Sequence, residues 1–240
     1  MKNKKITLIT NLLLVIILIS VFAVGVKSER SVTILGGEIS GAIYSGNESS
    51  GGVSLMFNVY ENAEVVEGII ELLKQKKATA TFFVGGSWAD DNGKILKEII
   101  DSNFELGNHG YFHKDHKKLS LKQNQEEIQN CHGVVKNFTG YSMNLFAPPS
   151  GSFSKTTIEV ASSLGYHTIM WSKDTIDWRD SDINTIVNRA TKNLKSGDLI
   201  LMHPKPHTLK ALPLILDEID KKGLKTLTVT NCCSLSPIKV

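Results

Sequence analysis

The segment Glu105-Leu106-Gly107-Asn108-His109-Gly110-Tyr111-Phe112-His113 joins an extended-looking stretch to two histidines that stand four residues apart. In a strand these side chains would lie about 13 Å apart, at roughly 3.3 Å per residue, whereas a helical turn brings such a pair within about 6 Å. One metal ion can bind both imidazoles only in the second case. The segment therefore predicts the end of a strand followed by a turn that carries two metal ligands, or else a surface coincidence among seven histidines.

Short apolar runs alternate with longer segments of helical period around this segment. Extended segments are expected at residues 53–57, 78–84, 104–108, 144–147, 167–172, 198–202 and 225–230, and helices at 63–76, 95–102, 121–137, 156–164, 183–194 and 209–222. Glycines at helix ends, such as Gly165 and Gly223, support these boundaries. The alternation predicts an α/β fold of parallel β/α units, and six or seven such units favour a barrel, complete or incomplete, over an open sheet.

Polar, small or turn-forming residues follow the carboxyl ends of these strands. They are Asn58 and Val59, His109 and His113, Pro148-Pro149-Ser150-Gly151, Asp174, Asp177 and Trp178, and His203. Strand ends of a parallel barrel converge on one mouth, so these residues are expected to meet there. Because several such residues rarely fall at strand ends by chance, the pattern favours a metal or catalytic site over a coincidence.

Residues 1–27 have the composition of a membrane anchor or a signal segment. Three lysines precede an uncharged run at residues 6–26, which would be about 31 Å long as a helix and could cross a bilayer. The positive flank is expected to stay in the cytoplasm and to place the rest of the chain outside. Ala23-Val24-Gly25 also resembles a cleavage site, so secretion after signal cleavage is the alternative.

Composition divides the remaining chain into three parts. Residues 28–52 are rich in Gly and Ser and are expected to be a spacer, residues 53–232 form the domain, and residues 233–240 form a tail. Residues 1–27 hold four of the 27 basic residues and no acid, which leaves 27 − 4 = 23 basic against 24 acidic residues. This balance gives no basic patch for nucleic acid. The three cysteines, Cys131, Cys232 and Cys233, do not form a disulfide framework.

Five segments resemble, in order and spacing, the landmarks of one known family. They are Ala-Thr-Ala-Thr-Phe-Phe-Val at 78–84, the histidine segment at 105–113, Phe-Ala-Pro-Pro-Ser-Gly-Ser-Phe at 146–153, Met-Trp-Ser-Lys-Asp-Thr-Ile-Asp-Trp at 170–178 and Leu-Ile-Leu-Met-His at 199–203. Residues 53–232 thereby resemble the polysaccharide deacetylase family, the NodB-homology domain. The resemblance implies a distorted (β/α) barrel that removes acetyl groups from N-acetylated sugars. It also implies a divalent metal, usually zinc, held by one aspartate and two histidines.

The resemblance assigns a role to each residue at the mouth. His109 and His113 correspond to metal ligands and His203 to the general acid. An aspartate of the fourth motif, Asp174 or Asp177, orients that acid, unless these carboxylates cap the turn before the helix at 183. The residues expected to contact substrate are Trp178, Pro149 and Ser150, although Trp178 can equally pack on the rim.

The chain departs from the family at four positions. Two consecutive aspartates of the first motif supply the base and a metal ligand, and here those positions hold Asn58 and Val59. The arginine that holds the base is replaced by Ala147 and the tyrosine of that motif by Ser150. The base and its arginine are therefore missing together. The same pattern resembles a subgroup of the family found in spore-forming bacteria.

Three hypotheses follow. The first is a membrane-anchored, metal-dependent hydrolase that removes N-acetyl groups from peptidoglycan or a related cell-wall glycan, with reduced activity. The second is an inactive glycan-binding pseudoenzyme on the same fold. The third is a hydrolase whose metal site uses Asp115 or His116 as a third ligand, although Asp115 is rather expected to brace the turn and His116 to be solvated. The expected partners are an N-acetylated cell-wall glycan and the membrane.

Overall fold

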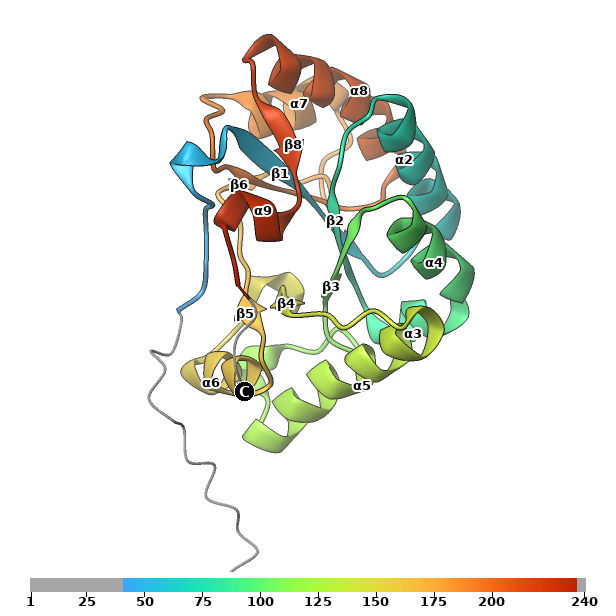
Figure 1. The fold of residues 1–240 in the computed structure, drawn as a ribbon, viewed down its shortest axis with the longest axis vertical. Helices are drawn as coiled ribbons and strands as arrows, with labels where there is room; N and C mark the ends of the chain where they lie inside the picture. Colours follow the sequence, from blue (N-terminus) through green and yellow to red (C-terminus); the bar gives the residue numbers. More distant parts are fainter. Residues whose placement is uncertain (1–40, 237–240) are drawn as a thin grey trace, which may run out of the picture. The chain divides into compact units, whose positions relative to one another are not determined.

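Strand β1 (Gly52–Val59) is the centre of the fold in the computed structural model, which describes residues 41–236 (Figure 1). All eight of its residues are buried. A strand that is covered on both faces needs an almost continuous apolar sequence, and Val-Ser-Leu-Met-Phe supplies it. β1 pairs with three other strands, and every pairing is parallel.

The strands form one curled sheet whose carboxyl ends share an edge. Its order is β5 (His167–Thr168), β4 (Leu145–Phe146), β3 (Glu105–Asn108), β2 (Thr81–Val84), β1, β7 (Leu199–Met202) and β6 (Lys173–Asp174), and β8 (Lys225–Leu227) pairs with the start of β1. Val59 lies opposite Val84, and Val84 lies opposite Asn108, so these strands end side by side. No pairing joins β5 to β6 among residues 41–236, which makes the sheet an open half-barrel. The predicted incomplete (β/α) barrel is confirmed.

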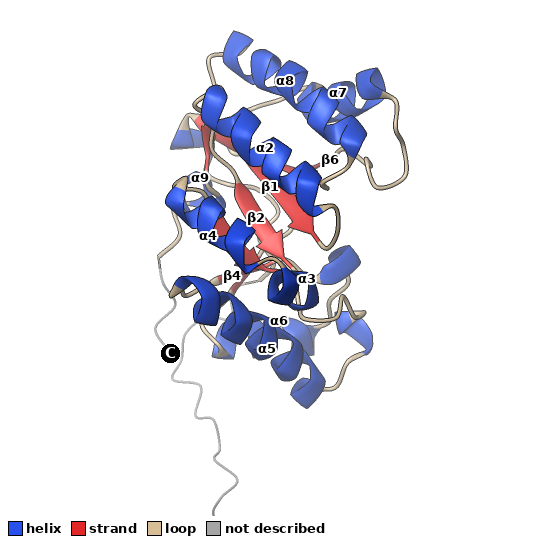
Figure 2. Cartoon of the chain, turned by 90° about the vertical axis from the view of Figure 1, so that its right-hand side faces the viewer, coloured by secondary structure: helices blue, strands red, loops and turns tan. Residues whose placement is uncertain are grey.

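Helices cover the outer face of this sheet (Figure 2). They are α2 (Ala63–Gln75), α3 (Gly86–Asp91), α4 (Gly93–Asp101), α5 (Leu121–Thr139), α6 (Lys155–Ser163), α7 (Ile183–Thr191) and α8 (Pro206–Lys221), with short 3₁₀ turns η1 (Glu48–Ser50), η2 (His116–Lys118) and η3 (Pro149–Gly151). The main apolar core lies between these helices and the sheet. A smaller core on the other face includes two residues of α9 (Val229–Cys233).

Alternation along β1 decides which side chains face the site. Leu55, Phe57 and Val59 belong to the core on the helix side, and Met56 belongs to the inner core. Successive side chains of a strand point to opposite faces, so Asn58 points inward like Met56. The last two residues of β1 therefore face different surroundings.

The sequence misplaced some short elements. The strand expected at 225–230 ends at Leu227, because the Thr228 side chain accepts a hydrogen bond from Asn231 N (3.2 Å) and begins α9. The short helix α3 was not anticipated, because Gly-Ser-Trp-Ala-Asp-Asp has no extended apolar period. β6 was missed as well, since a two-residue strand gives no alternation to detect.

Part of the predicted spacer packs on the domain. Ile43 forms a bridge with Ile169, and Gly46 N donates to Gly197 O (2.7 Å). The anchor or signal segment at 1–27, the first part of the spacer and the end of the tail lie outside the described residues. Within 41–236, no helix has the length and apolar character needed to cross a membrane.

Candidate functional site

A pocket of about 480 Å³ opens at the carboxyl edge of the sheet. Its lining comes from five separate parts of the chain: Asn58, His109, His113, Ser150, Trp171, Asp174, Trp178, Leu201 and His203. Most of the residues predicted at strand ends therefore meet at one mouth. Four predicted site residues do not line it, namely Val59, Ala147, Pro149 and Asp177, and each of them is buried.

The histidine pair lies on the predicted turn after β3. The chain reverses at Gly110, whose φ of 72° is left-handed, and the His109 and His113 ring centroids are 5.2 Å apart. His109 is 2% exposed, and its Nδ1 lies 2.7 Å from Ala147 O. A carbonyl can only accept, so Nδ1 carries the proton and Nε2 keeps the lone pair. His113 is exposed at the rim.

Helix α5 holds this turn in place through one carboxylate. Glu127 Oε2 accepts from Tyr111 N (2.9 Å) and Phe112 N (2.7 Å), while Lys114 Nζ lies 2.9 Å from Oε1. The Glu127 side chain is 4% exposed. Asn108 Oδ1 adds a bond from Gly110 N (2.9 Å). Three consecutive backbone amides of the turn are thus satisfied by buried acceptors.

Loss of the Glu127 carboxylate is expected to destabilise the protein. Glu127→Leu leaves two amides and Lys114 without their acceptor, so the free energy of unfolding should fall by about 2–4 kcal/mol. Glu126→Leu is the matched control, because the Glu126 side chain is 53% exposed and its one ion pair within the described residues is with Lys122, at 3.7 Å. Its effect should stay within about 0.5 kcal/mol. Urea unfolding measures both, and equal losses in the two variants would contradict the bracing role.

His203 is held by Asp177 and not by Asp174. Asp177 is 1% exposed; its Oδ1 accepts from His203 Nδ1 (2.7 Å), and its Oδ2 accepts from His203 N and Thr208 Oγ1 (2.7 Å each). Burial acts to raise the pKa of Asp177, but these bonds hold it below its usual value. Asp182 caps α7 by accepting from Thr185 N (2.8 Å), so the capping alternative does not apply to Asp177.

Asp174 has a separate local role. Its Oδ1 accepts from Ile176 N (2.8 Å), which shapes the turn after β6, and its side chain lines the pocket. The pocket therefore holds one half-buried carboxylate on the side of β6. That carboxylate comes from a different strand than the two histidines of the turn.

The residues present do not fit a zinc site. Zinc sites in proteins normally have at least three protein ligands, and here Val59 packs in the apolar core where the family has a carboxylate. Between residues 41 and 236, no three His, Cys, Asp or Glu side chains come close enough to hold a metal ion. The pair His109 and His113 is left without a third ligand.

The two residues considered as replacement ligands are engaged elsewhere. Asp115 accepts from Ser152 Oγ (2.5 Å) and pairs with Lys118 Nζ (2.9 Å), so it braces the loop as expected. His116 was expected to be solvated, and this is wrong: it is fully buried, with Nδ1 bonded to Asn124 Oδ1 (2.7 Å). His116 Nε2 has no hydrogen-bond partner among residues 41–236 and lies near Gly110, but neither His116 nor Asp115 completes a three-ligand group with the pair.

Tyr60 and Trp171 belong to the site but were not predicted. The Tyr60 ring centroid lies 4.9 Å from that of His113 and 6.1 Å from that of His109, and its hydroxyl donates to Tyr111 O. In the sequence, the position of Tyr60 directly after Asn58 and Val59 could have indicated that it belongs to the site. Trp171 lies in a segment predicted as extended, where an aromatic residue suggests packing more than a lining role.

Acid is expected to destabilise the domain through His109. Burial, with the neighbouring His113, lowers the pKa of His109 to about 3, whereas an unfolded chain titrates near about 6.5. Between these values the unfolded state binds a proton that the folded state does not. The free energy of unfolding should therefore decrease by about 1.4 kcal/mol per pH unit from this group as the pH falls through the window. His109→Gln should flatten the dependence of the urea midpoint on pH, and an unchanged slope would contradict this.

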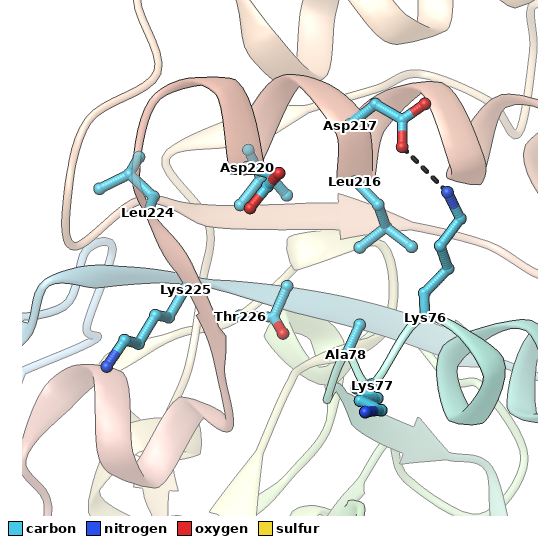
Figure 3. A pocket seen from close by; sticks show the side chains of 10 residues that line it. Lys76, Lys77, Ala78, Leu216, Asp217, Asp220, Leu224, Lys225 and Thr226 are labelled. Carbon is cyan, nitrogen blue, oxygen red and sulfur yellow. Dashed lines mark hydrogen bonds and ion pairs between the residues drawn. The ribbon is translucent and has the colours of Figure 1, made fainter.

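A second hollow lies at the opposite edge of the sheet (Figure 3). It has a volume of about 500 Å³ and lies between the loop before β2, the end of α8 and the start of β8. The ion pair of Lys76 Nζ and Asp217 Oδ1 (3.0 Å) lies at its rim. None of the residues predicted for the site lies there, so the pocket at the carboxyl edge remains the candidate.

Comparison with known families and proteins identifies relatives of the whole domain. The sequence profile of the family described as polysaccharide deacetylase matches residues 45–169. The uncharacterized protein YlxY of Bacillus subtilis is 34% identical over 188 residues, covering 78% of this chain and 59% of YlxY. Peptidoglycan-N-acetylmuramic acid deacetylase PdaA of Bacillus subtilis is 34% identical over 188 residues, covering 76% of this chain and 71% of PdaA.

Solved structures with the same fold include a protein described as a pseudoenzyme and a mutant of it. BA3943 of Bacillus anthracis is described as a CE4 family pseudoenzyme; it is 33% identical, with a TM-score of 0.78, over 81% of this chain and 69% of the other. One mutant of BA3943 is described as having restored enzymatic activity, and it matches with the same TM-score at 31% identity. This chain is thus similar both to peptidoglycan deacetylases and to a pseudoenzyme.

Proposed function

Because the chain belongs to the polysaccharide deacetylase family, we propose that its pocket binds an N-acetylated cell-wall glycan, such as peptidoglycan, without rapid turnover. The observation that carries this proposal is Asn58 in the pocket at the position of the family's catalytic base. The proposal combines the family's substrate class with a site that has lost its proton acceptor. The proposed binding site lies within residues 41–236 and does not depend on the anchor.

The lining suits a sugar. Trp171, Trp178 and Leu201 give apolar surface for the C–H face of a pyranose, and Trp178 is 56% exposed at the rim. Asn58, Ser150 and Asp174 add hydrogen-bonding groups. Pockets for small ligands commonly combine a mostly apolar wall with a few fixed polar groups of this kind.

The same lining is poorly suited to hydrolysis. Cleavage of an acetamide by water needs a base that takes the proton of the attacking water, and a carboxamide such as that of Asn58 has no such basicity. A metal would supply polarisation of the carbonyl and a more acidic water. The two imidazoles of the pair do not make a three-ligand site for it, so no step is assigned to a metal here.

Slow deacetylation is a second candidate function, and one observation favours it. His203 is oriented by Asp177 as a general acid would be: its Nδ1 is bonded, and its Nε2 has no partner among residues 41–236. A group placed in this way can donate a proton to a departing sugar amine. In this candidate function His203 serves as the acid, and Asn58 leaves the reaction without a base.

Binding and turnover are separable in one experiment. Titration of the full chain with N-acetylglucosamine oligomers and with peptide-free glycan strands should show saturable binding. An enzymatic acetate assay with added zinc should show no release of acetate. Acetate release at the rate of an active relative would instead establish the deacetylase. Absence of binding to every glycan would contradict the proposed function.

The location outside the membrane is also a proposal. Its support is the uncharged run at residues 6–26 with lysines before it. Full-length chain should be recovered in membrane fractions, and a shortened form in the medium would show that the segment is a cleaved signal. The connection to sporulation stays a prediction from the resemblance.

A further inference from the structure

Asn58 carries a buried oxygen that no part of the described chain satisfies. The residue is 5% exposed, and its Oδ1 has no hydrogen-bond partner within residues 41–236. The side chain nevertheless lines the pocket together with His109 and His203. Leaving a buried acceptor unpaired costs about 1–3 kcal/mol, and such groups are rare in folded proteins. A ligand that donates a hydrogen bond into the pocket would remove this cost.

The surroundings of Asn58 are buried on the side of the histidine turn. His109 is 2% exposed there, and its Nδ1 lies 2.7 Å from Ala147 O. Leu201, Trp171 and Trp178 add apolar surface to the same pocket. Such a lining favours a neutral ligand group with a donor and an acceptor over a charged one.

We propose that Asn58 makes the pocket selective for the intact acetamido group of the glycan, so that the protein distinguishes acetylated from de-N-acetylated strands. This inference rests on the proposed glycan binding and specifies what that site recognises. A carboxamide has both an acceptor oxygen and donor N–H groups, which match the N–H and C=O of an acetamide. A carboxylate at this position could only accept. An aspartate at this position is suited to proton transfer, whereas the asparagine is suited to binding the acetamido group.

A de-N-acetylated sugar is disfavoured for two physical reasons. Its ammonium group offers donors only, so the Asn58 Nδ2 donors would be left without the acetamide carbonyl. Its positive charge would also have to leave water for a pocket wall that is mostly neutral, with only Asp174 contributing a carboxylate from the side of β6. Asn58→Asp supplies a counter-charge on β1 itself and should reverse this preference.

The test compares two tetrasaccharides by calorimetric titration of the full chain, in zinc-free buffer at mildly acidic pH where the amine is protonated. The probes are the tetramer of N-acetylglucosamine and the tetramer of glucosamine. The native chain should bind the acetylated tetramer at least about tenfold more tightly, the value of one well-placed hydrogen-bonded group. Asn58→Leu should lower this ratio several-fold, with the remainder set by the cost of burying the ammonium charge, and Asn58→Asp should turn it in favour of glucosamine.

Ser54→Ala is the matched control. Ser54 lies on the same strand and the same face as Asn58, is fully buried, and also has an unpartnered oxygen, but it does not line the pocket. The ratio of affinities should not change in this variant. Equal binding of both tetramers by the native chain, or a ratio that Asn58→Leu leaves unchanged, overturns the inference while leaving glycan binding intact. If neither tetramer binds, the proposed function fails and the inference falls with it.

Discussion

Val59→Asp is expected to raise the affinity of the full chain for zinc by on the order of 100-fold or more. The native chain offers two neutral imidazoles. A carboxylate at position 59 adds a third ligand and a negative charge once it turns from the helix-side core, where Val59 packs, toward the pair. Tyr60, the next residue, already contacts the His113 ring at a centroid distance of 4.9 Å, so the end of β1 lies beside the pair. Zinc titration by calorimetry, with a competing chelator for tight binding, measures the change.

The same substitution should couple stability to zinc. Val59 is fully buried in the core on the helix side, so an aspartate there should lower the free energy of unfolding by about 3 kcal/mol or more without metal. Zinc should restore much of this loss. Val84→Asp is the control, because Val84 is fully buried and lies opposite Val59 in the sheet. Its destabilisation should not respond to zinc, and an equal rescue of both variants would contradict a specific ligand role.

The triple variant Asn58→Asp, Val59→Asp and Ala147→Arg is expected to gain N-deacetylase activity on N-acetylglucosamine oligomers. A positioned base contributes typically about 10²–10⁴-fold, so the gain over Val59→Asp alone should be in that range. Ala147 is fully buried in the inner core, which means that an arginine there is tolerated only with a carboxylate partner. Asn58→Asp supplies that partner in the family's arrangement.

Acetate release with zinc present measures this gain. Ala147→Arg alone should destabilise the protein, and the combination with Asn58→Asp should recover stability, which a double-mutant cycle would show as favourable coupling. His203→Ala in the triple variant is the second control and should remove most of the activity. If Val59→Asp alone releases acetate as fast as the triple variant, the missing base does not explain the absence of turnover in the native chain.

The sequence predicted the fold well because short apolar runs alternate with segments of helical period along the chain. β1, β2, β3 and β7 were all anticipated within a few residues, and the open half-barrel agrees with the expected incomplete barrel. β6 and α3 were not anticipated, because Lys173-Asp174 has no apolar run and Gly-Ser-Trp-Ala-Asp-Asp has no helical period. The packing of Ile43 against Ile169 was also missed, since a long-range contact of a Gly/Ser-rich segment leaves no local pattern.

The sequence predicted which residues form the site better than it predicted the hydrogen bonds between them. The strand-end rule brought Asn58, the histidine pair and His203 to one mouth, because parallel strands end together. It could not choose between Asp174 and Asp177, which stand three residues apart in an irregular turn; the hydrogen bonds of His203 decide for Asp177. Burial of His116 was likewise hidden, because its partner Asn124 comes from the next helix.

The most direct test of glycan recognition without turnover is a single calorimetric titration of the native full chain with the N-acetylglucosamine tetramer in the presence of zinc, followed by an acetate assay on the same sample. Saturable binding with no acetate above the protein-free blank is the predicted result. Acetate release that grows with time and protein concentration, or the absence of any binding heat, would contradict it.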